Sequence, residues 1–120
     1  MSMYAMPTPS AYDLFRSAQR LFARKRYLEA SHELEALLGH PDACDPQGHG
    51  VHDARQLLAR AYYHSAQLSR AEGLSRAILE DHPDDAYTML LLGRTLQRAH
   101  RGEEARGWLH RAEVLGQSLT

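Results

Sequence analysis

The side chains with the most evident chemistry are the histidines and the cysteine between residues 40 and 52. They are His40, Cys44, His49 and His52. Imidazole nitrogen and thiolate sulfur are ligands that zinc prefers in proteins. The spacing of these residues matches none of the usual short paired-ligand motifs. A polar loop that happens to be rich in histidine is therefore the favoured interpretation, and the sequence predicts no bound metal and no cofactor.

Paired carboxylates are the other candidates for chemistry. Glu103-Glu104 and Asp84-Asp85 each stand at the expected start of a helix, where acidic side chains favour the helix dipole. Cys44 has no basic neighbour to lower its pKa and make it a nucleophile. The chain contains no glycine-rich phosphate loop, metalloprotease helix motif or nucleophile elbow. The sequence thus predicts a protein that is not an enzyme.

Composition sets broad limits. The 120 residues fit one domain, and 43% of them are hydrophobic. A net charge of −1 gives no general argument for nucleic acid or a membrane as partner, and no apolar run resembles a membrane span or a signal peptide. One cysteine fits a reducing compartment, so we expect a cytoplasmic location. Lys25 is the only lysine among 14 basic residues, a bias typical of bacterial genomes rich in G and C.

The elements that must position any site are helices in pairs. Between residues 86 and 115, two amphipathic stretches flank a polar break at Arg101-Gly102. The first has Met89, Leu92, Gly93 and Leu96 on one face, and the second has Ala105, Leu109 and Ala112. Gly93 and Ala105 are small where two packed helices must approach closely. A lone hairpin of this kind cannot bury both apolar faces, so it needs a neighbour of the same kind.

A similar hairpin lies 34 residues upstream. A shift of 34 residues aligns the two hairpins position by position: Leu58-Ala59 with Leu92-Gly93, Tyr62 with Leu96, Ala71 with Ala105, and Ile78 with Ala112. A first copy contains Ala18, Leu21, Tyr27, Ala30, Leu34 and Leu37 in corresponding places. The step from Ala30 to Ala71 is 41 residues, so seven residues are inserted between the first two copies. The insertion, residues 40–50, is rich in proline, glycine and aspartate and predicts a loop.

The spacing Leu58-Ala59-x-x-Tyr62, Ala71 and Pro83 resembles the tetratricopeptide repeat, a unit of two helices and a turn. This resemblance implies an all-α fold of six helices, in which three repeats stack as a right-handed α-solenoid. The repeats span about residues 11–39, 51–84 and 85–116 of a domain covering residues 10–116. Residues 1–9 and 117–120 are expected to be tails, the first of them flexible.

Helix boundaries follow from capping signals. We expect helices over residues 11–24, 27–38, 51–65 and 69–80, and two more that together extend from about residue 86 to 115. Ser10 and Asp84 or Asp85 are suited to N-terminal caps. Gly39 and Gly116 are suited to C-terminal ends.

The resemblance also implies a binding function. In this family the first helix of each pair lines a concave groove that holds a peptide or a helix of a partner protein. Carried onto this sequence, the groove would present Tyr12, Gln19, Phe22, Gln56, Arg60, Tyr63, His64, Tyr87, Arg94, Gln97 and Arg98. Asp53 is the one acidic residue at its edge. Arginine among aromatic rings suits carboxylates, so we expect a partner with an acidic segment.

One subclass of the family grips the C-terminal carboxylate of chaperones with Lys and Asn clamp residues. The matching positions here hold Phe15, Gln19, Tyr87 and Leu91, so a chaperone adaptor of that subclass is disfavoured. Nucleic acid is a less favoured partner for Arg60, Arg94 and Arg98, because the chain as a whole is not basic.

A second surface is predicted on the last helix. No capping helix follows it, so an apolar patch there would face water in a monomer. Its residues are Trp108, Leu109, Ala112 and Leu115. Two chains that met about a two-fold axis would cover both patches, so a homodimer is a further hypothesis. The alternative to a peptide-binding module is accordingly a self-assembling regulatory or scaffold subunit of an enzyme or secretion complex.

Overall fold

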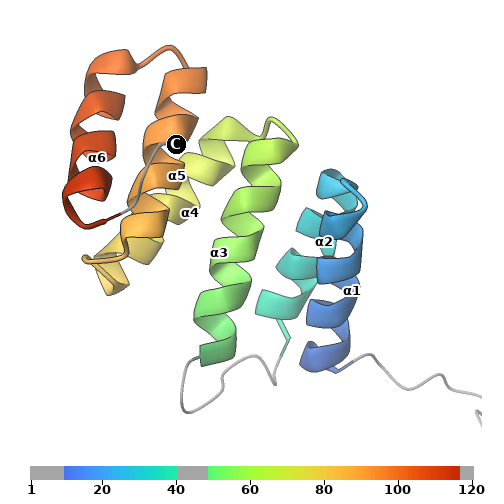
Figure 1. Ribbon diagram of the computed structural model, residues 1–120. Helices are drawn as coiled ribbons and strands as arrows, with labels where there is room; N and C mark the ends of the chain where they lie inside the picture. The colour runs from blue at the N-terminus through green and yellow to red at the C-terminus, as the bar shows by residue number, and fades with distance from the viewer. Residues whose placement is uncertain (1–9, 41–48, 117–120) are drawn as a thin grey trace, which may run out of the picture.

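Three helical hairpins follow one another along the chain (Figure 1). The computed structural model describes residues 10–40 and 49–116, and within these ranges it contains six α-helices and no strand. They are α1 (Ala11–Ala23), α2 (Tyr27–Leu38), α3 (His49–His64), α4 (Leu68–Asp81), α5 (Ala86–Arg98) and α6 (Gly102–Val114). The predicted all-α fold class is confirmed. Each helix packs against the next one in the chain, and α3 also contacts α5.

Two expected features fall outside the described residues. The proposed tails, residues 1–9 and 117–120, are not described, and neither is the part of the inserted loop that contains Cys44. Among the helices that the structure does describe, none is both long enough and apolar enough to cross a bilayer.

Capping explains where several helices begin and end. The Ser10 hydroxyl accepts a hydrogen bond from the Asp13 backbone N–H, and the Asp13 carboxylate accepts one from the Ser10 N–H. This capping box satisfies amides that the first turn of a helix leaves open. Asp85 caps α5 by accepting from the Thr88 N–H at 3.2 Å. Gly116, with φ of 101°, follows the last residue of α6 and its cap, as the sequence predicted.

The third helix starts earlier than expected. Residues 49 and 50 belong to α3, although they were predicted to be loop. Proline and glycine content favoured a loop throughout this segment, but helix propensity is a weak local term that packing overrides. The buried Ala54 and Leu58 hold α3 against its neighbours, and the helix extends back from them.

The turns inside the three hairpins share one backbone geometry. Lys25, Ala66 and His100 have φ of 62°, 63° and 63°, in the left-handed region. In each turn, the residue directly after the left-handed one donates its backbone N–H to the carbonyl five residues before it, as in a Schellman motif. These bonds join Arg26 to Leu21, Gln67 to Tyr62 and Arg101 to Leu96, at 2.9, 2.8 and 2.9 Å. The three left-handed residues are 41 and 34 positions apart, so the repeat in sequence is also a repeat in backbone geometry.

The last turn corrects one prediction. Its break was expected at Arg101-Gly102, but the left-handed residue is His100, and Gly102 is the first residue of α6. The hydrogen bond from Arg101 to Leu96 fixes this position, because it requires a left-handed conformation at the residue between the α5 cap and Arg101. The hydrogen bond of the turn thus decides which residue is left-handed, although glycine adopts this conformation more readily than histidine.

Small residues lie where paired helices cross. Ala18, Ala59 and Gly93 occupy the same position in the three repeats, and all are buried. In the last hairpin, a Cβ placed on Gly93 would lie 2.5 Å from Cδ2 of Leu109. Close approach at this crossing, which the sequence predicted, is therefore confirmed.

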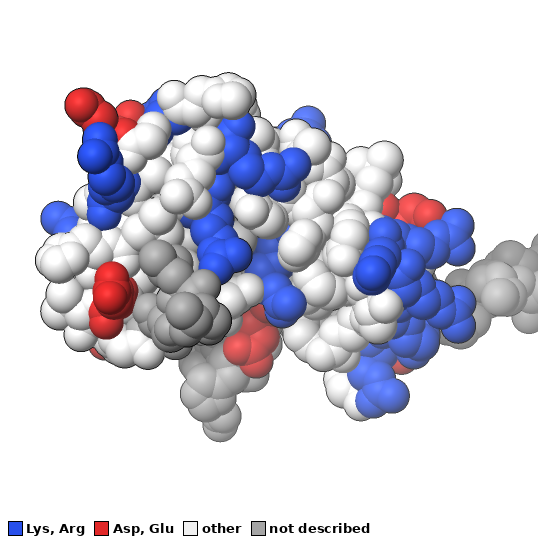
Figure 2. Space-filling view, turned by 45° about the horizontal axis from the view of Figure 1, so that its top comes forward, with Lys and Arg blue, Asp and Glu red and all other residues white. Residues whose placement is uncertain are grey.

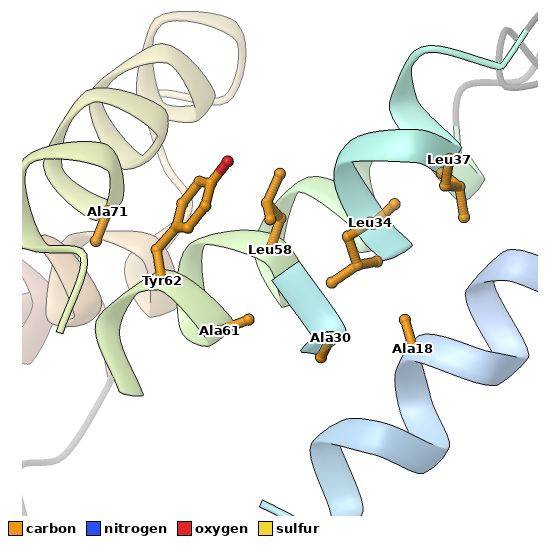
Figure 3. Packing of buried hydrophobic residues seen from close by; sticks show 9 residues of the cluster. Ala18, Ala30, Leu34, Leu37, Leu58, Ala61, Tyr62 and Ala71 are labelled. Atoms are coloured by element: carbon orange, nitrogen blue, oxygen red, sulfur yellow. The ribbon is translucent and has the colours of Figure 1, made fainter. Parts of the chain in front are cut away.

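The core continues from one hairpin into the next. Figure 3 shows Ala18 of α1 opposite Leu34 and Ala30 of α2, with Leu58 and Tyr62 of α3 beyond them. The Tyr62 hydroxyl donates to Oε2 of Glu35 at 2.6 Å and so joins α3 to α2. Burial, and then this hydrogen bond, raises the pKa of Tyr62 to about 12. The phenol is therefore neutral at ordinary pH and remains a donor.

The predicted apolar patch on α6 is divided between core and surface. Leu109 and Ala112 are buried against α5 and are not available to a second chain. Trp108 is half-buried against the same cluster, with Cζ of Arg111 4.9 Å from its ring. Adjacent residues differ by about 100° around a helix, so Trp108 and Leu109 cannot share one exposed face. Leu115 is 51% exposed, and association through it and Trp108 stays a prediction.

Substitution of the left-handed turn residue tests the turn geometry. We expect Ala66→Gly to stabilise the fold by about 1 kcal/mol, because glycine adopts positive φ without the clash that Cβ causes. The same change at exposed Ala36 in α2 should cost about 1 kcal/mol, the ordinary penalty for glycine in a helix. Thermal and urea unfolding would measure both. Loss of stability in both variants would contradict the assigned turn.

A glycine pair tests the close helix crossing. Gly107→Ala should stabilise the protein by about 1 kcal/mol, since a Cβ there meets nothing within 4 Å. Gly93→Ala should lower the melting temperature instead, because overpacking against Leu109 costs about 1–3 kcal/mol. Equal stabilisation by both changes would show that α5 and α6 do not approach this closely.

Candidate binding pocket

A pocket of about 400 Å³ lies where α1, α3 and α5 meet. Figure 1 shows α3 between the α1–α2 hairpin and the α5–α6 hairpin, so the pocket draws on all three repeats. Its lining consists of Phe15, Gln19, Phe22 and Ala23 from α1, Asp53, Gln56, Leu57 and Arg60 from α3, and Tyr87 from α5. This volume is within the range of sites that bind small ligands or short peptide segments.

Helical spacing explains why these side chains converge. The four residues of α1 lie at positions i, i+4, i+7 and i+8, and the four of α3 lie at i, i+3, i+4 and i+7. Each set occupies one face of its helix. Ala18, on another face of α1, is in the core, which leaves the pocket face of α1 available to a ligand.

Arg60 is the cation of the pocket, and aromatic rings hold it. Its Cζ lies 4.6 Å from the ring centroid of Phe22 and 5.7 Å from that of Tyr87. Within the described residues it has no hydrogen-bond acceptor and no carboxylate partner. Arg55 on the same helix is different, because its Nη1 lies 2.8 Å from the Asp81 carboxylate. The five N–H donors of Arg60 therefore remain for a ligand.

The wall near α5 is fixed by polar contacts. Gln56 donates through Nε2 to Oδ2 of Asp85 at 2.7 Å, and Asp85 also accepts from the Thr88 hydroxyl at 2.6 Å. Burial raises the pKa of Tyr87, and nearby Arg60 opposes this rise only in part. Tyr87 therefore presents a neutral phenol to the pocket.

An aromatic cluster adjoins the pocket at the turn between α1 and α2. His64 stacks on Tyr27 with 4.6 Å between ring centroids, and Phe22 and Tyr63 meet it edge-on at 5.7 and 5.3 Å. Burial lowers the pKa of His64, and the neighbouring Arg60 and Arg98 lower it further. His64 is therefore largely neutral at pH 7 and acts as a ring in this cluster.

Arg98 has a structural role that the sequence did not indicate. It donates through Nη1 to the backbone carbonyl of Tyr63 at 2.6 Å, and its Cζ lies 4.7 Å from the Tyr63 ring centroid. That carbonyl is at the C-terminal end of α3, where helix carbonyls lack partners within the helix. Arg98 thus joins α5 to the end of α3.

The eleven predicted groove residues divide into three groups. Those that line the pocket are Gln19, Phe22, Gln56, Arg60 and Tyr87. Tyr63, His64 and Arg98 form or contact the adjoining aromatic cluster. Tyr12, Arg94 and Gln97 are exposed and outside the pocket lining.

The sequence reasoning missed three pocket residues, Phe15, Ala23 and Leu57, and placed Asp53 only at the edge. The signal for Phe15 and Ala23 was available, because each is four residues from Gln19 on the same helix face.

The histidines near the inserted loop do not converge where the structure describes them. Nε2 of His52 lies 3.4 Å from Oδ2 of Asp85, and the ring packs against His82 with 4.0 Å between centroids. Among the described side chains, no three His, Cys, Asp or Glu residues are placed to hold a metal ion. Cys44 and the side chain of His49 lie outside the described residues.

Comparison with known proteins adds no assignment to this geometry. The chain matches no protein-family model, and no curated protein is similar to it in sequence.

Proposed function

We propose that the protein is a non-catalytic interaction module of the tetratricopeptide type, which binds an acidic segment of a partner protein. The observation that carries this proposal is the Arg60 guanidinium, which lies against Phe22 and Tyr87 and forms no ion pair with a carboxylate of the described residues, although Asp53 also lines the pocket. The shared turn geometry of the three hairpins supports stacking as a solenoid, with the pocket on the concave side.

The pocket suits a carboxylate in particular. A guanidinium offers two parallel N–H groups to the two oxygens of a carboxylate, which gives a charge-assisted, bidentate contact. Phe22 and Tyr87 restrict the side chain of Arg60 and exclude water from one side of it. Less conformational freedom is then lost when a ligand binds.

Catalysis finds little support in the same residues. The ionisable groups of the pocket lining are Asp53, Arg60 and Tyr87. Arg60 is charged at neutral pH, and the raised pKa of Tyr87 keeps its phenol protonated. The lining offers no activated nucleophile next to a base, which most acyl- and phosphoryl-transfer sites require.

Self-assembly is a second candidate function, and one observation favours it. Val114 and Leu115 at the end of α6 are 70% and 51% exposed. Apolar side chains that share an exposed end are candidates for contact with a second chain. The loss of Leu109 and Ala112 to the core makes this surface smaller than the sequence predicted.

Loss of the Arg60 charge should weaken binding without unfolding the protein. Peptides selected on the parent protein from a displayed random library should be enriched in Asp and Glu. Arg60→Gln should weaken the best of them by at least about tenfold in calorimetric titration, equivalent to about 1.4 kcal/mol. The melting temperature should change little, because a cation–π contact of this exposure contributes only about 0.5–1 kcal/mol.

The matched control is Arg106→Gln, which removes an exposed arginine on α6 that is remote in the fold from the pocket. It should leave affinity unchanged. Selected peptides without acidic enrichment, or equal affinity of the parent and Arg60→Gln proteins, would refute the proposed function.

A further inference from the structure

A row of exposed basic side chains runs along α1 beside the pocket. Arg16, Arg20 and Arg24 lie at i, i+4 and i+8, and Lys25 follows in the turn; these four residues are called the basic stripe. All four are exposed. Figure 2 shows basic atoms gathered over the end of the molecule that contains α1, with few acidic atoms among them.

The basic stripe differs from the arginine cluster on α4 and α6 in having no acidic partner among the described residues. On α4 and at the start of α6, Arg76 and Arg101 share the carboxylates of Glu72 and Glu104 at distances of 2.7 to 3.1 Å. Within the described residues, no member of the basic stripe forms an ion pair with a carboxylate. Like charges at i and i+4 destabilise a helix, so this arrangement has a cost to the fold.

The helix dipole accounts for only part of the row. Positive charge near the C-terminal end of a helix is favourable, and this applies to Arg20 and Arg24 in the last turns of α1. Arg16 lies near the middle of α1, beyond the reach of that effect. It is held by Tyr12, whose hydroxyl accepts a hydrogen bond from Nη1 at 3.0 Å.

The basic stripe and the pocket share one edge of α1. Gln19 and Ala23 line the pocket, and they lie three and seven residues after Arg16. Positions i, i+3, i+4 and i+7 form one continuous helical surface, so Gln19 and Ala23 alternate with Arg16 and Arg20 along it. A chain that leaves the pocket over Gln19 therefore passes directly onto the basic stripe.

We propose that the partner segment occupies both places: one carboxylate binds Arg60 in the pocket, and a run of further Asp or Glu residues lies extended along the basic stripe. This inference rests on the proposed function and adds the charge and the length of the partner segment. From residue 16 to residue 24 the helix rises about 12 Å, a length that about four residues of extended polypeptide cover. The partner is thus a segment with several acidic residues.

The composition of the pocket favours a polypeptide over other polyanions. Asp53 lines the pocket on α3 and repels any anionic group next to it. A polypeptide can place an uncharged residue beside Asp53, whereas a phosphate backbone is charged at every unit. The amide of Gln19 matches the donors and acceptors of peptide groups. The faces of Phe22 and Tyr87 are engaged with Arg60, so they do not offer open platforms for nucleic-acid bases. An anionic membrane would contact the basic stripe without entering the pocket.

Two synthetic peptides separate the two contacts. The short peptide carries one glutamate in a neutral glycine-serine context, and the long peptide continues from the same sequence into a run of glutamates. Both carry fluorescein and blocked termini, and fluorescence anisotropy measures their affinity for the intact chain. The variants are Arg60→Gln, the triple substitution Arg16→Gln with Arg20→Gln and Arg24→Gln, and a control with Arg106→Gln and Arg111→Gln on α6.

The long peptide should bind the parent protein at least about tenfold more tightly than the short one in about 50 mM salt, and this advantage should shrink in about 200 mM salt. The triple substitution should remove the advantage and leave the short peptide within about twofold of its parent affinity. Arg60→Gln should weaken both peptides, and the α6 control should weaken neither. A variant with lysine in place of Arg16, Arg20 and Arg24 should still bind the long peptide more tightly than the short one. This result would show that the triple Arg→Gln substitution acts by removing charge and not by disturbing the fold.

Several outcomes would overturn the inference. If the long peptide binds no better than the short one while Arg60 is still required, the basic stripe is not part of the site and the proposed function stands. If neither peptide binds, the proposed function fails together with the inference. If oligothymidylate, or vesicles of phosphatidylglycerol and phosphatidylcholine, bind through the basic stripe more tightly than the long peptide does, the ligand is a nucleic acid or a membrane and the acidic polypeptide is wrong.

Discussion

Close approach of paired helices is the constraint on which this structure depends. Ala18, Ala59 and Gly93 recur at one buried position of the three hairpins, and Ala30, Ala71 and Ala105 recur at another. Small side chains at these positions let the two helices of a hairpin pack with little space between their backbones. The turns between the helices repeat as well, because Lys25, Ala66 and His100 share a left-handed backbone conformation with nearly the same φ. Repetition of one crossing and one turn brings α1, α3 and α5 together around the pocket.

The features of the fold that could be predicted from sequence are those with a local periodic signal. Apolar spacing located the helices to within two residues where their bounds were predicted, and Ser10 and Asp85 cap α1 and α5 as expected. The prediction failed where packing or hydrogen bonding overrides residue preference. Glycine at position 102 suggested the break of the last turn, but the bond from Arg101 to Leu96 places the left-handed residue at His100. Leu109 was expected at the surface, yet the absence of a side chain at Gly93 gives it a place in the core.

The candidate site could be predicted only in outline, for a related reason. Helical periodicity indicates which face a residue occupies, but it does not indicate what lies opposite that residue. Arg60 and Arg98 were both predicted to line the groove. In the structure, Arg98 bonds the Tyr63 carbonyl, whereas among the described residues Arg60 meets only aromatic rings. Arg55 is neutralised by Asp81 from the end of another helix. The pairing of each arginine decides which cation remains for a partner, and such pairing depends on contacts between helices that are distant in sequence.

The central claim is that ligands bind between α1, α3 and α5. The most direct test is a map of chemical-shift changes in isotope-labelled protein titrated with a selected acidic peptide. The account predicts the largest changes at Gln19, Arg60 and Tyr87, with little change along α4 and α6. Changes concentrated on α4 or α6, with those three residues unaffected, would contradict it.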